Sequence, residues 1–272
     1  MTSESIGESN VSTLSKVRGV AFSLVAVVTL ILPGVMLGGE LLLAFTGWTT
    51  DMGTHQVHDM ISFPMLWLAL LIPVATLLYR PKRRVTTVLA PLVFLAPLVV
   101  FALAADSPIL MLPLIFGVLG LVLVALHPAG RSVLRLDRVE RLNRLLAGLV
   151  VVAAVPLLVF AGDQILRQVT LADDHVLFVH YGAMAAGAVY IVLMAALATV
   201  RERDWRFAAW SAGAVAVLLG ATSLAFTVES SAGPLWGALA VAWGVAFVGV
   251  AEYTRRPVVE TTPSQPDTPQ PM

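Results

Sequence analysis

Long apolar runs separated by short polar segments dominate the chain. Windows of about 20 apolar residues, the length that an α-helix needs to cross a bilayer, recur along the 272 residues. They lie at about 19–45, 59–79, 86–105, 107–126, 146–167, 175–199, 206–227 and 233–253. Solid runs such as LAGLVVVAAVPLLVF lack the alternation of a membrane β-barrel strand. The pattern predicts an all-α polytopic membrane protein with eight transmembrane helices.

Composition agrees with a membrane protein and narrows the chemistry. The chain is 58% hydrophobic and 12% charged, whereas soluble domains carry roughly 25% charged residues. It has no cysteine, which excludes disulfides, thiolate metal sites, iron–sulfur clusters and a cysteine nucleophile. The sequence also has no P-loop, dinucleotide fingerprint, serine-hydrolase elbow or HExxH motif. Redox chemistry would therefore require a bound cofactor, and nothing indicates nucleic-acid binding.

Charge divides the chain between two membrane faces. Eight crossings place both termini on one side together with sixteen of the seventeen Lys and Arg residues, Arg167 being the exception. The positive-inside rule makes that side cytoplasmic and predicts a multi-pass plasma-membrane protein with both termini inside. The opposite face collects four of the five histidines and a group of acids: Glu40, Asp51, Asp59, Asp106, Asp163, Asp173, Asp174 and Glu229.

The same pattern predicts five segments. Residues 1–18 and 256–272 are polar, and the second is also Pro-rich, which predicts a disordered cytoplasmic tail at each terminus. Residues 19–127 and 146–255 each hold four apolar windows, and residues 128–145 form a basic cytoplasmic linker. That linker is either a loop that sets topology or a short basic helix on the anionic inner leaflet.

The two four-window segments share an order of residues. ILPGVMLGGELLL in the first window and AVPLLVFAGDQIL in the fifth align with a spacing of 123 residues, and a histidine opens the next window of each segment 122 residues apart. The matching pairs are Pro33 and Pro156, Gly39 and Gly162, Glu40 and Asp163, and His58 and His180. The simplest interpretation is two tandem parallel four-helix bundles related by an axis along the membrane normal.

The repeated acids and histidines are the candidate site. A carboxylate that accepts the ring N–H of a histidine is a common outer partner of metal ligands, and imidazole suits haem iron, copper or zinc. We therefore expect His58 and His180 to be cofactor or metal ligands, with Glu40 and Asp163 orienting them or relaying protons. The alternative is structural, because Arg167 lies four residues after Asp163 and would neutralise it, and interfacial histidines are often simply solvated.

The remaining histidines are expected to stay outside this site. His55 lies in the connection before His58, and His175 precedes His180 by five residues, about 140° around a continuous helix. Both are predicted to be surface residues. His127 precedes Pro128 at the cytoplasmic side, away from the other four.

This layout resembles the haem A synthase family of eight-helix membrane proteins, built from two four-helix repeats. The best local likeness is LLGATSLAFTVESSAGPLWGALAVAWGVAF, which is similar to that family's seventh and eighth helices and the turn between them. The resemblance implies haem ligands at the outer ends of the second and fourth helices of each repeat. His58 and His180 match the second-helix positions, whereas the fourth-helix positions, around 110–113 and 235–238, hold no histidine.

The family's outer-loop cysteine pairs are absent too, so haem A synthesis is not expected. Haem b would need a single axial histidine, a methionine such as Met111, or a site shared by His58 and His180. The leading hypothesis is a haem- or metal-associated membrane protein in electron transfer or in oxidase or cofactor assembly, with a respiratory or assembly partner in the bilayer. The alternatives are a small cation or proton-coupled transporter or channel, lined by Glu40 and Asp163, and a structural accessory subunit. Whether the protein is an enzyme is left open.

Overall fold

The computed structural model describes residues 3–134, 142–201, 203–228 and 230–255, and every regular element in that part of the chain is helical. The first half of the chain contains α1 (Ser3–Met36), α2 (Gly38–Thr46), η1 (Gly53–His55), α3 (Gln56–Met65), η2 (Leu66–Leu71), α4 (Ile72–Leu77), η3 (Pro81–Arg83), η4 (Thr87–Leu89), α5 (Ala90–Ala104), α6 (Met111–Leu126) and η5 (Gly130–Val133). The second half contains α7 (Arg144–Thr170), α8 (Asp174–Leu177), α9 (His180–Val200), α10 (Trp205–Ala225) and α11 (Gly233–Thr254).

Seven helical segments within the described residues are long and apolar enough to cross a membrane. They are Ser15–Met36, Gly53–Leu77, Thr87–Ala104, Arg144–Thr170, His180–Val200, Trp205–Ala225 and Gly233–Thr254. The predicted all-α polytopic membrane protein is thereby confirmed. The eighth window corresponds to α6, which is apolar but has only 16 residues, fewer than the roughly 20 that span a hydrocarbon core. Eight crossings therefore stay a prediction.

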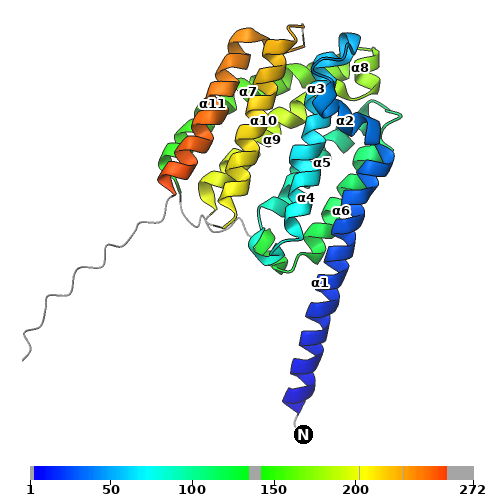
Figure 1. Cartoon of the computed structure of the whole chain (residues 1–272), viewed down its shortest axis with the longest axis vertical. Helices are drawn as coiled ribbons and strands as arrows, with labels where there is room; N and C mark the ends of the chain where they lie inside the picture. Colours follow the sequence, from blue (N-terminus) through cyan, green and yellow to red (C-terminus); the bar gives the residue numbers. More distant parts are fainter. Residues whose placement is uncertain (1–2, 135–141, 202, 229, 256–272) are drawn as a thin grey trace, which may run out of the picture.

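The helices run between two ends of the molecule (Figure 1). We call the end that carries η1, α8 and the start of α11 the histidine end, and the end that carries η3, η5 and the start of α10 the basic end. In the second half, α9 packs against α7 and α10, and α10 packs against α11. The halves meet where α9 contacts α3 and α5. The predicted tandem repeat is neither confirmed nor contradicted by these contacts.

Helices of the first half are interrupted where the sequence predicted continuous spans. The window at 19–45 is divided between α1 and α2 at Leu37, four residues after Pro33, where the backbone leaves the helical conformation with φ −133° and ψ 30°. Pro64 precedes η2, a π-helical stretch between α3 and α4, and such stretches often occur at functional sites. At the other end, α1 begins at Ser3, inside the predicted tail 1–18. The predicted tail 256–272 lies outside the described residues, as do residues 135–141 of the linker.

The second half is built from longer helices in closer contact. α10 and α11 cross through glycines, and a Cβ atom at Gly213 would lie 2.8 Å from the carbonyl oxygen of Gly244. A Cβ atom at Gly220 would likewise press against the carbonyl oxygen of Gly237. Only glycine allows the two backbones to approach so closely, which is how small residues promote helix association in membranes.

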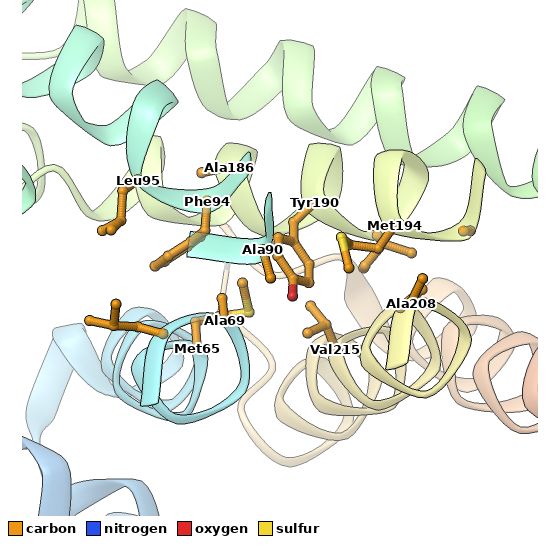
Figure 2. Close-up of a cluster of buried hydrophobic side chains, with 14 of the residues drawn as sticks. Met65, Ala69, Ala90, Phe94, Leu95, Ala186, Tyr190, Met194, Ala208 and Val215 are labelled. Atoms are coloured by element: carbon orange, nitrogen blue, oxygen red, sulfur yellow. The ribbon is translucent and has the colours of Figure 1, made fainter. Parts of the chain in front are cut away.

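A shared apolar core joins the two halves. Figure 2 shows Met65 of α3, Phe94 of α5, Tyr190 of α9 and Val215 of α10 meeting around one cluster. The buried Tyr190 hydroxyl is satisfied by the Ser211 hydroxyl at 2.6 Å, as a buried polar group requires. α9 is thus the element through which both halves pack.

A second link lies at the basic end. The Asp204 carboxylate forms an ion pair with Arg84 at 3.2 Å and accepts hydrogen bonds from the backbone N–H groups of Thr86 at 3.1 Å and Thr87 at 2.7 Å. This contact ties the connection before α5 to the start of α10. The halves are therefore held together at both ends of α9.

Candidate functional site

Four histidines gather at the histidine end, where the two halves meet. They come from four separate elements: His55 of η1, His58 of α3, His175 of α8 and His180 of α9. Ring centroids are 4.5 Å apart for His55 and His175, 5.0 Å for His55 and His180, and 5.4 Å for His58 and His180. One ligand atom each of His55, His175 and His180 lie within 4.8 Å of one another. We call these four residues the histidine cluster.

The sequence prediction for His55 and His175 was wrong, since neither is a surface residue apart from the site. Both are half-buried, and their rings stack with an interplanar angle of 29°. The error came from assuming one helix from 175 to 199. The helix is divided between α8 and α9 by Val179, a buried residue with φ 58°, so the 140° spacing does not apply.

The break before α9 has identifiable causes. Asp173 caps α8 by accepting a hydrogen bond from the Val176 N–H at 3.0 Å, and Gln168 of α7 accepts one from the Gly182 N–H at 2.9 Å. A left-handed conformation is a genuine outlier for a β-branched residue such as Val179, and strained backbone of this kind clusters at functional sites. The turn brings His175 and His180 to the same place.

His180 is held by residues of the first half. Its Nε2 atom lies 3.4 Å from Asp59 Oδ1, and its Nδ1 atom lies 3.2 Å from His55 Nδ1. The predicted carboxylate partner of His180 was Asp163, whereas the structure places Asp59 against His180. Asp59 directly follows His58 on α3, and both residues contact His180: Asp59 lies against its Nε2 atom, whereas the His58 ring stacks on its face.

His58 is held by residues of the second half. It is buried, and its Nε2 atom lies 3.0 Å from the Ser230 hydroxyl. Gln164 in turn donates to the Ser230 carbonyl oxygen at 3.1 Å. The His58 Nδ1 atom is buried and has no hydrogen-bond partner among the described residues. If Nε2 carries the proton, Nδ1 presents a free lone pair.

His175 connects the cluster to its surroundings through polar contacts. Its Nε2 atom lies 3.3 Å from the Thr54 carbonyl oxygen, and its Nδ1 atom lies 3.7 Å from Asp173 Oδ2. The Tyr181 hydroxyl donates to the same Asp173 oxygen at 3.1 Å. Contacts of this type orient metal-binding imidazoles in known sites.

The two predicted carboxylates have different surroundings. Asp163 forms the expected ion pair with Arg167 at 2.9 Å, and half of its side chain is exposed. It is linked to the cluster indirectly, through Gln164, whose side-chain amide contacts both Asp163 and the Ser230 carbonyl oxygen. Glu40, in the first turn of α2, is half-buried and lines a cavity that reaches His180. The structure therefore brings His58 and His180 together but not Glu40 with Asp163.

That cavity, of about 430 Å³, lies between α3, α5, α6 and α9. Its lining is mainly apolar and includes the rings of Phe63, Phe94, Phe116 and Phe178. Its polar lining residues are Glu40, His55, Asp59, Ser62 and His180. Met111, a possible axial ligand on sequence grounds, is 57% exposed at the start of α6 and does not line it.

The fifth histidine lies elsewhere, as predicted. His127 is buried near the basic end with its ring edge against Phe22, the centroids being 5.5 Å apart. Burial lowers the pKa of the His127 imidazole to about 4, so this residue is neutral at physiological pH.

Comparison with known protein families, with characterised proteins and with solved structures finds no match to this chain. The site must therefore be interpreted from its own geometry. What the structure supports plainly is an integral membrane protein whose apolar helices contact the lipid bilayer.

Proposed function

We propose that this integral membrane protein binds a transition-metal ion of the copper or zinc class in the histidine cluster. The observation that carries the proposal is the convergence of His55, His175 and His180, whose ligand atoms lie within 4.8 Å of one another. Imidazole is a preferred ligand of zinc, copper, iron and nickel. Three such donors from three separate elements are the usual protein contribution to an open metal site.

The distance between two of the donors fits this assignment. Tetrahedral sites have metal–nitrogen bonds of roughly 2.0–2.1 Å, so two ligand nitrogens are ~3.3 Å apart. The His55 and His180 Nδ1 atoms are 3.2 Å apart. Without an ion the same pair is compatible with one N–H···N hydrogen bond. Binding an ion between these two nitrogens requires that this proton leave, and the three donors, which lie within 4.8 Å of one another, must close up to tetrahedral spacing.

The outer contacts favour the same interpretation. Asp59 lies against His180, Thr54 against His175 and Ser230 against His58. Each of these oxygens can accept an imidazole N–H, which leaves the other ring nitrogen unprotonated and available to a metal. His58, buried with a free Nδ1 atom, is the candidate fourth ligand.

Haem b fits the same residues less well. Two axial histidines point one nitrogen each at an iron between them, whereas the rings of His58 and His180 stack at 13° with both Nε2 atoms engaged by Ser230 and Asp59. The cavity beside His180 has no Lys or Arg in its lining, so haem propionates would find carboxylates rather than cationic partners. A bare ion is therefore the better assignment, with haem on His180 alone as the alternative that the experiment examines.

The role of the ion follows from its place. A histidine site at the membrane surface suits electron transfer or the supply of metal during oxidase or cofactor assembly, which are the functions that the resemblance to haem A synthases implies. The charge pattern predicts that this surface is extracytoplasmic. A respiratory or assembly partner in the same membrane is part of this proposal.

Metal titration of the purified, chelator-treated protein in detergent tests the proposal. We expect one equivalent of Zn²⁺ or Cu²⁺ to bind, with nitrogen hyperfine structure in the electron paramagnetic resonance spectrum of the Cu²⁺ form. His55→Ala and His175→Ala should each weaken binding by about a hundredfold, since even an outer partner contributes 10–100-fold. His127→Ala, which removes the histidine at the basic end, is the matched control and should bind the ion normally.

Stoichiometric binding that survives both cluster substitutions would refute the assignment, as would no binding at all in the wild-type protein. The visible spectrum, recorded with and without reductant after expression with excess haem, separates the haem alternative. If a Soret band is lost in His180→Ala but kept in His175→Ala, the bound group is a haem with His180 as its one axial histidine, and not a bare ion.

A further inference from the structure

The cavity beside His180 has the size and lining of a binding site for a small organic molecule. Its volume of about 430 Å³ falls within the roughly 300–1,000 Å³ of ligand sites. Walls contributed by α3, α5, α6 and α9 are apolar, with four phenylalanine rings. The interrupted helices α1/α2 and α3/η2 border it through Leu37, Glu40 and Leu66.

The carboxylates of this cavity have no Lys or Arg beside them among the lining residues. Glu40 and Asp59 contribute two carboxylates, and no Lys or Arg belongs to the lining. Asp59 is engaged by His180. Glu40 has no ion-pair or hydrogen-bond partner in the described part of the chain, although it is half-buried among apolar side chains.

A second polar group in the cavity also lacks a partner. The Ser62 hydroxyl is inaccessible to solvent and makes no hydrogen bond within residues 3–134, 142–201, 203–228 and 230–255, and it belongs to the lining. Buried hydroxyls are almost always paired. An unpaired carboxylate and an unpaired hydroxyl in one cavity are two independent indications that a ligand completes it.

Charge selects the class of ligand. A carboxylate in a region of low dielectric constant repels anions and attracts cations, far more strongly than it would in water. The faces of phenylalanine rings attract organic cations as well. A small inorganic cation would need a shell of oxygen ligands, which Glu40, Asp59 and Ser62 alone do not supply.

We propose that the cavity binds an amphiphilic organic cation, with its ammonium-type head beside Glu40 and its apolar body among Phe63, Phe94 and Phe116. The Ser62 hydroxyl accepts an N–H from the head where the ligand carries one. The site goes beyond the proposed metal centre and does not require it. The two adjoin, because His55 and His180 belong to the cavity lining as well, so an ion in the histidine cluster would weaken the binding of a cation in the cavity.

Two probes of the same shape and opposite charge test this inference. Binding of tetraphenylphosphonium and of tetraphenylborate is measured by equilibrium dialysis on the full chain in a neutral detergent, with a chelator present so that metal binding plays no part. We expect saturable binding of the phosphonium and none of the borate. Glu40→Gln should weaken phosphonium binding by about tenfold, because an ion pair is replaced by a neutral contact.

Asp163→Asn is the matched control, because Asp163 carries the same charge at the corresponding chain position but lies outside the cavity, paired with Arg167. It should leave phosphonium binding unchanged. Equal binding of both probes would overturn the proposal in favour of a merely apolar cavity. Unchanged affinity in a Glu40→Gln protein with wild-type thermal stability would overturn it too. Failure of metal binding, by contrast, would leave these results unaffected.

Discussion

Glu40 and Asp163 are paired by the predicted sequence repeat, but their surroundings in the structure differ. Asp163 lies on the continuous helix α7, half-exposed and paired with Arg167. Glu40 lies just after the break between α1 and α2 and lines the cavity without a partner in the described residues. A similar residue order thus gives a neutralised, half-exposed acid on the continuous helix α7, which contains Pro156, and an acid without a partner in the described residues just after the break at Leu37.

The difference reflects how the halves are packed. α10 and α11 of the second half approach through glycines, which leaves no room between them. In the first half the chain leaves the helical conformation at Leu37 and turns π-helical after Pro64, and a proline or a π-helical turn is a usual cause of a helix kink. The cavity is lined mainly by the interrupted helices of the first half and is closed on one side by Phe178 and the start of α9, next to the histidine cluster.

The largest expected effect comes from filling the glycine contact of the second half. Gly220→Ala would press a methyl group against the Gly237 carbonyl oxygen and should destabilise the protein by about 3 kcal/mol, the upper range for overpacking. Gly39→Ala in the first half has no atom within 4 Å of the new Cβ and should change stability little. Thermal unfolding in detergent, followed by tryptophan fluorescence, measures both. Similar unfolding midpoints for the two variants would contradict the contrast in packing.

A second pair of substitutions adds the same side-chain volume to the common core and to the cavity. Ala212 of α10 is fully buried in the common core, so Ala212→Leu should cost about 2 kcal/mol by overpacking. Ala183 of α9 lines the cavity, so Ala183→Leu should be tolerated in thermal unfolding while it weakens tetraphenylphosphonium binding. A strongly destabilised Ala183→Leu protein would mean that the cavity has no room for the larger side chain, which would contradict the contrast.

A third pair of substitutions tests the contacts by which each half positions a histidine of the other half. His180 is held by Asp59, and His58 is held by Ser230, so Ser230→Ala should leave the His58 ring free to turn. We expect Zn²⁺ or Cu²⁺ affinity to fall by about tenfold, the lower range for an outer partner of a ligand. Within the described residues, the hydroxyl of the neighbouring Ser231 bonds to Val228 and Gly233 of its own turn, so Ser231→Ala should bind metal as the wild type does. Equal affinities in the two variants would remove His58 from the site.

Local sequence signals predicted the parts of this structure that depend on neighbours along the chain. Apolar windows of about 20 residues gave the membrane helices, and the four-residue spacing gave the pair of Asp163 with Arg167, which the structure confirms. The equivalence of His58 and His180 placed both at the histidine end, where their rings stack. These features follow from helix periodicity and from chain order.

What the sequence missed depends on contacts between distant segments. No glycine or proline stands at the break at Val179, so neither of the usual helix-breaking residues marks it. The break is stabilised by Gln168 of α7 and by the Asp173 cap. On one continuous helix, His175 would point away from His180. The Asp173–Asp174 pair before His175 was the available signal, since an aspartate is a preferred N-cap of a new helix. The partnership of Asp59 with His180 required knowing that α3 packs against α9.

The smallest expected effect is the most direct comparison of the two acids. Asp163→Asn removes an exposed i,i+4 ion pair, which contributes about 0.3–0.5 kcal/mol, so the unfolding midpoint should fall slightly or not at all. Glu40→Gln removes a carboxylate that has no partner in the described residues and lies in an apolar setting, so the midpoint in the absence of ligand should rise, because a charge in such a place is costly. Tetraphenylphosphonium should then stabilise the wild type and Asp163→Asn more than Glu40→Gln, because only a ligand that binds the folded state raises the midpoint. Two acids that were equivalent in structure as well as in chain position would respond alike in both measurements, and that result would refute the contrast between the halves.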